Sequence, residues 1–96
     1  NLAAQAGAYQ NATWVVSVAK AGVEDGVGLI GSSVIVDPTG VIVQQAKTKE
    51  DELLVHDCDL DLCKHGKEHM FAFERHRRPE HYGIICSQAG ITPPPE

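Results

Sequence analysis

Two runs rich in β-branched residues flank the tetrapeptide Asp37-Pro38-Thr39-Gly40 in the stretch SSVIVDPTGVIVQQA. Proline presets the backbone of a turn, glycine can take a positive φ, and valine and isoleucine favour strands. The pattern therefore predicts a β-hairpin across residues 32–46. This hairpin constrains the rest of the chain, because an apolar sheet must be covered by other elements.

Three further segments precede the hairpin. Residues 1–11 carry apolar side chains near helical spacing and are interpreted as the end of a helix. The run TWVVSVAKAG, residues 13–22, is mostly apolar and suits a strand that is buried on both faces. Residues 22–31 contain four glycines and are expected to form a loop.

After the hairpin, residues 51–61 alternate enough to predict another strand. Asp59 or Asp61 can cap a helix that runs to about Glu74. An extended arm is expected from Arg75 onward. The stripe of the helix that we expect to be buried consists of Leu62, Gly66, Met70 and Phe73.

The predicted helices do not suffice to cover strands that are apolar on both faces. The rest of the cover must then come from other sequence or from another subunit. The chain also begins at Asn1 within a helical pattern, and its only methionine is Met70. We therefore expect a processed product or a piece of a longer polypeptide.

Composition narrows the class of protein. The chain of 96 residues suffices for one domain at most, and 43% apolar with 22% charged residues is near the globular average. No apolar stretch approaches the ~20 residues that span a bilayer. A net charge of -5 argues against a nucleic-acid partner, and an odd number of cysteines favours reduced thiols. We expect a cytoplasmic protein with neither a membrane nor a nucleic-acid partner.

The stretch LCKHGKEHM contains His65, Glu68 and His69 in the order H-x-x-E-H, the spacing of one class of zinc hydrolases. Histidines four residues apart share a helix face and can bind zinc, and the adjacent carboxylate can act as a base. Gly66 interrupts this helix, however, and no separate acidic ligand follows on another predicted helix. The pattern therefore favours ordinary histidines on a solvated helix flank over a zinc site.

A second catalytic hypothesis groups Glu24, Lys20 and Cys58 as base, oxyanion stabiliser and thiol nucleophile. Cys58 lies between Asp57 and Asp59 in the sequence. Neighbouring negative charges disfavour a thiolate, and catalysis needs the thiolate. The electrostatics therefore oppose this trio.

The stretch ERHRRPEHYGII concentrates positive charge and could bind phosphate. Glu74 and Glu80 flank the cluster, and no glycine-rich cradle accompanies it. A subunit-contact arm is favoured instead, with arginines that pair to carboxylates and apolar anchors. The candidate contact residues are Arg75, Arg77, Arg78 and Tyr82.

Two amides, Gln10 and Asn11, lie at the junction between the first helix and the first strand. Buried amides need hydrogen-bond partners, so these side chains can lock the turn or face a ligand pocket. The structural role is favoured on the residues alone.

The succession of AYQNATWVVSVAKAG, a glycine-rich loop, GSSVIVDPTGVIV, LLVHDCDLD and FERHRRPEHYG resembles the C-terminal third of the carbon-nitrogen hydrolase (nitrilase) superfamily. The resemblance covers residues 6–85. The segment HRRPEHYG looks like the N-carbamoyl-D-amino-acid amidohydrolase branch.

The resemblance implies part of an α/β four-layer αββα sandwich: here a helix end, about four strands including the hairpin, one helix and a C-terminal arm. Family members use a Glu base, a Lys and a Cys nucleophile, all in motifs upstream of this segment, so no residue here is assigned as catalytic. Asn11 matches the amide of a family motif in which Gln10 replaces a common Glu, and Ser33 matches the serine at the hairpin entry. These three residues are the candidates for the vicinity of the substrate pocket.

The implied parent enzyme hydrolyses N-carbamoyl amino acids or other small amides, with no cofactor and no metal, and forms a homo-oligomer through the arm. Residues 1–86 would be the incomplete C-terminal segment of its domain, and residues 87–96 a loose tail. The segment alone is expected to be inactive. The alternative is a noncatalytic, truncated assembly module.

Overall fold

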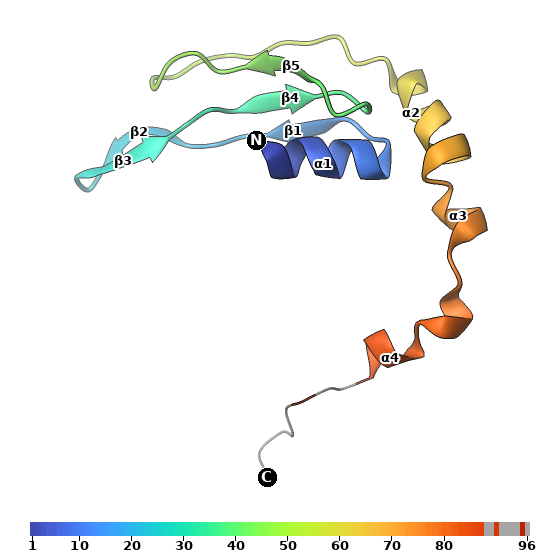
Figure 1. Cartoon of the computed structure of the whole chain (residues 1–96). Helices are drawn as coiled ribbons and strands as arrows, with labels where there is room; N and C mark the ends of the chain where they lie inside the picture. The colour runs from blue at the N-terminus through green and yellow to red at the C-terminus, as the bar shows by residue number, and fades with distance from the viewer. Residues whose placement is uncertain (88–89, 91–94, 96) are drawn as a thin grey trace.

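The chain forms a thin plate from which a long arm extends (Figure 1). The computed structural model describes residues 1–87, 90 and 95. Its radius of gyration is 19.0 Å, whereas a compact domain of this length has about 12 to 13 Å. The smallest principal extent, 18 Å, leaves room for one helix layer on one sheet. The single helix layer can therefore bury only part of the apolar surface of the sheet.

A three-stranded antiparallel sheet forms the centre of the plate. Its strand order is β1 (Val15–Ser17), β4 (Val34–Val36) and β5 (Ile42–Gln45). The pair β4 and β5 is the predicted hairpin, with a register irregularity after Ile35. The hairpin prediction is therefore confirmed.

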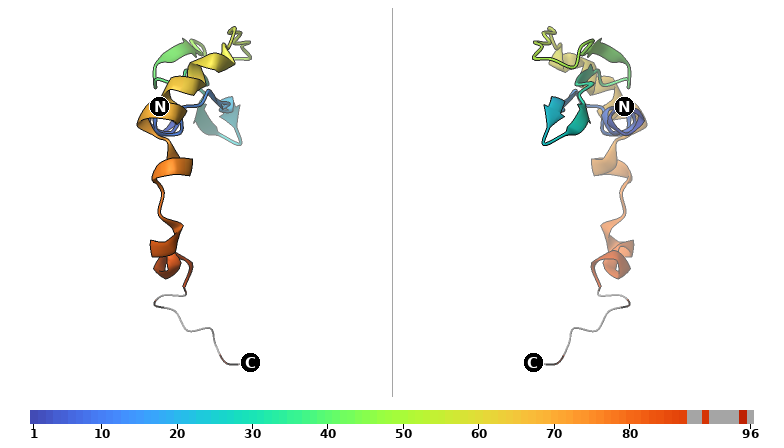
Figure 2. Two further views of the ribbon diagram at one scale, coloured as in Figure 1. Left: turned by 90° about the vertical axis from the view of Figure 1, so that its right-hand side faces the viewer. Right: turned by 90° about the vertical axis from the view of Figure 1, so that its left-hand side faces the viewer.

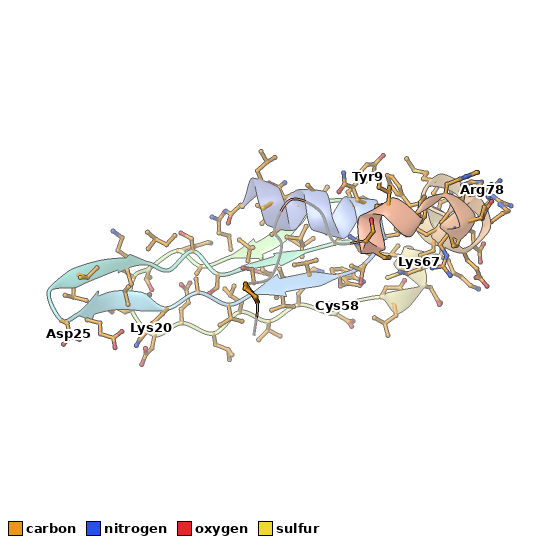
Figure 3. The ribbon with its side chains drawn as sticks, turned by 90° about the horizontal axis from the view of Figure 1, so that it is seen from below. Tyr9, Lys20, Asp25, Cys58, Lys67 and Arg78 are labelled. Carbon is orange, nitrogen blue, oxygen red and sulfur yellow. The ribbon has the colours of Figure 1, made fainter. Side chains whose placement is uncertain are left out.

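Helix α1 (Leu2–Asn11) covers one face of this sheet (Figure 3). Ala8 packs against Val34 and Val36, and these three residues are at most 1% exposed. The helix is rich in alanine, which favours helix and allows close approach to the sheet. The helix is capped by the next residue, Ala12, whose backbone is in the left-handed conformation with a φ of 46°. The predicted helix is confirmed, and it builds the core together with three partly buried neighbours, Ala4, Val15 and Ile42.

The turn between β4 and β5 is tied both to itself and to α1. Oδ1 of Asp37 accepts hydrogen bonds from the backbone N–H of Thr39, 2.8 Å, and of Val41, 3.1 Å. Gln5 Nε2 in α1 donates to the carbonyl of Gly40, 3.0 Å. Gly40 has a φ of 86°, and a Cβ there would lie 3.2 Å from the Gln5 carbonyl oxygen. Glycine is thus required for both the turn and the helix contact.

The face of the sheet opposite α1 is open near β1, although Ile35 of β4, the partner of Val16, is only 7% exposed. Val16 is 62% exposed, and Val18 beyond the end of β1 is 84% exposed. The prediction of one strand over residues 13–22 buried on both faces is therefore wrong, because β1 is short and lies at the edge of the sheet. Central β4 is the strand whose residues are all buried.

The glycine-rich residues 22–31 do not form the predicted loop. They contribute to an antiparallel hairpin of β2 (Ala21–Glu24) and β3 (Val27–Ile30). Asp25 and Gly26 connect the strands with φ values of 50° and 79°, as a two-residue primed turn requires. The described chain thus has five strands where about four were expected.

Residues 51–59 run extended along the side of the sheet away from α1, but they pair with no strand (Figure 3). The prediction of a strand across 51–61 is wrong in that respect. Its alternation is nevertheless visible, because Leu54, His56 and Cys58 are half-buried and the residues between them are exposed. Trp14 Nε1 donates to the Asp59 carbonyl, 2.9 Å, and holds the end of the segment.

The helix predicted to reach Glu74 is divided into short pieces. They are η1 (Leu60–Leu62), α2 (Cys63–His65), the π-helical turn η2 (Gly66–Met70) and α3 (Phe73–His76). The prediction of an Asp59 cap is confirmed, because its carboxylate accepts from the backbone N–H of Asp61, 3.0 Å.

The expected buried stripe of this helix is also mostly wrong. Leu62, Met70 and Phe73 are 49%, 50% and 51% exposed. Gly66 is the member that packs, since a Cβ added to it would lie 2.5 Å from the Ala12 Cβ. The π-helical turn explains the change, because it alters the angular spacing on which the stripe was based.

The C-terminal arm comprises residues 73–87, and every residue in it is exposed. It contains α3, η3 (Pro79–His81) and α4 (Gly83–Cys86), and it leads away from the plate (Figure 2). The arm begins two residues before the predicted position. Most of the predicted loose tail, 87–96, lies outside the described residues. Among the described residues, no helix has the length and apolar character needed to cross a membrane.

Candidate functional site

Ser33 holds together the chain segments at one end of the central sheet. Its Oγ accepts a hydrogen bond from the Ala19 backbone N–H, 2.8 Å, and can donate to the Ala19 carbonyl, 3.3 Å. The Ser33 carbonyl accepts from the Ala46 backbone N–H, 2.8 Å. The side chain is half-buried. Ser33 therefore joins the connection after β1 to the entry of β4 and the exit of β5.

A groove of about 310 Å³ opens beside Ser33. Lys20 lines it and forms an ion pair with Glu24, and both side chains are more than half exposed. On the opposite wall, Glu52 accepts from the backbone N–H groups of Lys47 and Thr48, at 2.9 and 3.2 Å. These hydrogen bonds lower the pKa of Glu52. The groove thus has polar walls of both charge signs.

Gln10 and Asn11 lie at the other end of the sheet. Both are exposed on the last turn of α1, and Asn11 Nδ2 donates to the Gly7 carbonyl, 2.9 Å. The β1–β4 register pairs Val15 with Val36 and Ser17 with Val34. Asn11 therefore precedes one end of the ladder, and Ser33 lies beyond the other. The structure does not bring the three pocket candidates together.

Lys67 is a contact residue that the sequence did not reveal. Its Nζ donates to the Asn11 carbonyl, 2.9 Å, at the C-terminus of α1. A cation there complements the unpaired carbonyls of the last helical turn. Tyr9 packs edge-to-face on Phe71 with ring centres 5.1 Å apart. Both contacts join residues more than fifty positions apart, which periodicity along the sequence cannot pair.

The carboxylate of Asp37 has its pKa lowered. Partial burial acts in the opposite direction, but the hydrogen bonds from Thr39 and Val41, with a smaller contribution from the charge of His56, outweigh it. His56 also lies against Trp14, with ring centres 5.5 Å apart. These residues are a structural cluster at the turn rather than an acid–base pair.

The rejected trio of Lys20, Glu24 and Cys58 is not assembled. Lys20 lies by the β2–β3 hairpin, whereas Cys58 lies in the middle of the plate (Figure 3). The Cys58 thiol can donate weakly to the His56 carbonyl at 3.8 Å. All three cysteines, Cys58, Cys63 and Cys86, are free thiols.

The histidines of the H-x-x-E-H pattern do lie side by side. The ring centres of His65 and His69 are 4.9 Å apart, and both side chains are exposed. Within the described part of the chain, no three or more His, Cys, Asp or Glu residues gather into a metal-binding group. The three-ligand arrangement of a zinc hydrolase is therefore not assembled from these residues.

In the arm, two of the candidate contact arginines bind backbone carbonyls. Arg78 Nη1 donates to the carbonyls of Arg75, His76 and Arg77, at 3.0 to 3.2 Å. Arg75 Nη2 donates to the Glu68 carbonyl, 3.3 Å.

The other two contact candidates lie in the same exposed segment. The Tyr82 hydroxyl accepts from the Arg78 backbone N–H, 2.9 Å. Arg77 is exposed. Several polar side chains of the arm thus bond nearby backbone groups, while Ile84 and Ile85 remain 80% and 77% exposed.

Comparison with known proteins relates this arrangement to one family. The family model for carbon-nitrogen hydrolase matches residues 1–68. N-carbamoylputrescine amidase of Solanum tuberosum is 40% identical over 63 residues, which are 66% of this chain and 21% of that protein. The amidase of the same name from Oryza sativa subsp. japonica is 36% identical over 67 residues, 70% of this chain and 22% of that protein.

A solved structure shares the fold. The crystal structure of carbon-nitrogen hydrolase from Helicobacter pylori G27 superimposes with a TM-score of 0.72 at 24% identity, covering 88% of this chain and 31% of that one. This likeness confirms the expected α/β, nitrilase-like fold class. The chain spans about a fifth of the length of the curated relatives it matches. Since the family model matches well over half of its residues, the chain belongs to the carbon-nitrogen hydrolase family.

Proposed function

We propose that this chain is a scaffold segment of a larger carbon-nitrogen hydrolase that acts on N-carbamoyl compounds. The observation that carries the proposal is the 40% identity to an N-carbamoylputrescine amidase over 63 residues. In the larger protein, residues 1–86 belong to the hydrolase domain. The Glu, Lys and Cys of the family mechanism are supplied by sequence outside this segment.

The proposed reaction breaks the ureido carbon-nitrogen bond. The cysteine thiolate attacks the carbonyl carbon, and the protonated glutamic acid delivers a proton to the departing ammonia. Water then attacks the carbon of the covalent intermediate, and the thiolate leaves. The resulting carbamic acid separates into carbon dioxide and the free amine, so that one urea group and one water yield ammonia, carbon dioxide and an amine.

For the amine part of the substrate, we propose an amino acid. The basis is the segment HRRPEHYG in residues 76–83, which resembles the N-carbamoyl-D-amino-acid amidohydrolase branch. The named relatives are amidases of N-carbamoylputrescine, in which the carbamoyl group is attached to putrescine. The two substrates share the reacting group but carry opposite charge at the far end, a carboxylate against an ammonium. Residues that recognise that end therefore decide between them.

Three residues of this chain are proposed to support the pocket of the larger protein. Ser33 fixes the strand connections beside a polar groove, which makes it a positioning residue. Gln10 and Asn11 lie at the opposite end of the sheet, and Lys67 holds the helix end that carries them. Their proposed role is at the junction of α1 and β1, where the Asn11 side chain bonds the Gly7 carbonyl within α1.

For the arm, we propose a contact with a second copy of the protein. The proposal rests on the full exposure of residues 73–87 and on the two adjacent isoleucines of α4. Arg75, Arg77, Arg78 and Tyr82 are proposed to line this contact. The noncatalytic assembly module stays the alternative function, since the same exposed surfaces suit it.

The experiment that tests the proposal compares two substrates on the polypeptide that contains this segment. Ammonia release is measured from an N-carbamoyl amino acid, in D and L forms, and from N-carbamoylputrescine. We expect turnover of the amino acid derivative, loss of all activity after thiol alkylation, and no activity of the 96-residue chain alone.

Three results would contradict parts of the proposal. Preference for N-carbamoylputrescine would refute the amino acid assignment and keep the carbamoyl group. Turnover by the 96-residue chain that resists thiol alkylation would refute the cysteine mechanism. A coding sequence whose frame supplies no Glu, Lys and Cys alongside this segment would favour the assembly module.

A further inference from the structure

His65 and His69 form a pair on the outer surface, in the segment that joins the plate to the arm. Their ring centres are 4.9 Å apart and their planes are inclined by 41°. Residues spaced by four share one face of a helix. Both imidazoles are exposed to solvent, so an incoming ion can reach them.

The backbone that carries this pair is anchored. The Phe71 N–H donates to the Gly66 carbonyl at 2.7 Å, an i to i+5 bond that closes the π-helical turn in which His69 lies and which His65 directly precedes. Gly66 packs against Ala12, and Lys67 Nζ donates to the Asn11 carbonyl, 2.9 Å. The pair is therefore presented by a turn that is fixed to α1 rather than by a fraying helix end.

We propose that His65 and His69 form a two-ligand surface site for a divalent transition metal ion such as Zn²⁺, with water in the remaining positions. Imidazole is a preferred ligand of Zn²⁺, Ni²⁺ and Cu²⁺. A metal about 2.1 Å from one nitrogen of each ring holds the ring centres about 4.6 to 5.3 Å apart at angles from about 90° to tetrahedral. The separation of 4.9 Å falls in that range.

Charges of both signs lie near the pair, since the exposed Lys64 precedes His65 in the sequence. Lys67, between the histidines in sequence, directs its ammonium group to the α1 carbonyl and away from them. Glu68 places an exposed carboxylate next to His69 in the same turn. The site differs from a zinc hydrolase centre because it has two protein ligands and no catalytic role.

Metal binding at this pair connects the two sides of the π-helical turn. A bound ion cross-links residues 65 and 69, so the helical backbone of this turn is favoured over its open forms. The arm begins three residues after the turn ends at Met70. Binding is therefore expected to slow opening of the segment from which the arm extends.

The test is a titration of the 96-residue chain with Zn²⁺, followed by calorimetry. We expect one ion per chain, and at least about tenfold weaker binding in each of His65→Ala and His69→Ala, since even loss of an outer-shell partner costs that much. His76→Ala and His81→Ala are the matched controls, because both side chains are exposed in the arm. These controls are expected to bind as the parent chain does.

A second readout guards against indirect effects. In proton NMR, Zn²⁺ is expected to shift the ring signals of His65 and His69 first, and the His65→Gln variant replaces the ligand by a polar side chain if the alanine variant fails to fold. The proposal is overturned if no saturable binding occurs. It is equally overturned if the affinity in the His65 and His69 variants equals that in the controls.

Discussion

The plate and the arm are stabilised in different ways. In the plate, α1 and β4 bury Ala8, Val34 and Val36 almost completely, and side chains bridge elements far apart in sequence. In the arm, every residue from 73 to 87 is exposed, and the guanidinium groups bind carbonyls within seven positions along the chain. Buried apolar area is the main source of folding free energy, so the plate has a core of its own, whereas residues 73–87 bury none within this chain.

The sheet face opposite α1 is intermediate in burial between the core of the plate and the arm. It belongs to the plate, yet Val16 and Val18 are 62% and 84% exposed on it. An apolar sheet face of this kind needs a second layer. The segment therefore contains one buried interface, between α1 and the sheet, and two largely exposed apolar surfaces, near β1 and in the arm.

The largest effect expected is at Val36 in the plate. Val36→Ala removes two methyl groups from a fully buried side chain and leaves a cavity, which costs about 2 to 3 kcal/mol in the free energy of unfolding. Ile84→Ala removes more carbon from an arm residue that is 80% exposed, and surface changes of this kind stay within about 0.5 kcal/mol. Urea denaturation of the 96-residue chain measures both. Equal losses of unfolding free energy in the two variants would contradict the claim that the plate has a core and the arm does not.

Substitution of Gly66 tests whether the π-helical turn is packed against the end of α1. Gly66→Ala places a Cβ 2.5 Å from the Ala12 Cβ, and overpacking of this kind costs about 1 to 3 kcal/mol. Gly83→Ala is the control in the arm, because nothing lies within 4 Å of the added Cβ. We expect the control to be neutral or slightly stabilising by thermal denaturation. A neutral Gly66→Ala would show that α1 and the π-helical turn are not packed as described.

Asp37 makes the stability of the plate depend on pH in the acid range. Asp37→Ala loses the hydrogen bonds from Thr39 and Val41, at a cost of about 1 to 2 kcal/mol at neutral pH. Because folding lowers the pKa of this carboxyl, its stabilisation is present above the ordinary value of 3.8 and is lost as pH falls through the lowered pKa.

Denaturation curves at several pH values measure this difference. The gap between the parent chain and Asp37→Ala is expected to narrow only below the ordinary pKa of an aspartic acid. Asp37→Asn keeps an acceptor oxygen and serves as the control that separates charge from hydrogen bonding. A gap that persists unchanged into strong acid would contradict the assignment.

The smallest effect expected is at Tyr82 in the arm. Tyr82→Phe removes one exposed hydrogen bond, accepted from the Arg78 backbone N–H. The free energy of unfolding of the isolated chain should change by less than about 0.5 kcal/mol. Sedimentation of the larger protein is the complementary measurement, since Tyr82→Ala should weaken self-association if the arm binds a second copy. A large stability loss in the isolated chain would mean that the arm contributes to the fold on its own.

The sequence predicts local structure correctly where a few adjacent residues determine it. The helix over residues 1–11 and the turn at Asp37-Pro38-Thr39-Gly40 were predicted because their signals are local. The β2–β3 hairpin was missed although Asp25-Gly26 is a strong primed-turn signal. Four glycines in one short stretch obscured it.

Elements that depend on contacts between residues far apart in sequence could not be predicted. Residues 51–59 alternate as a strand should, but a ladder also needs a partner. The predicted helix is interrupted at Phe71 and Ala72, whose backbone angles are not helical. Gly66 keeps a helical backbone and packs against Ala12, which lies far away in sequence. Among the pocket candidates, Ser33 was identified by its match to the family motif, whereas its hydrogen bonds to Ala19 appear only in the fold.

Hydrogen–deuterium exchange of the 96-residue chain tests most directly the claim that the plate has its own core and the arm does not. We predict the slowest exchange at the β4 amides, Val34–Val36, and exchange near the rate of an unfolded peptide across residues 73–87. Protection of the arm equal to that of β4 would contradict the account, and so would a plate whose amides exchange as fast as the arm.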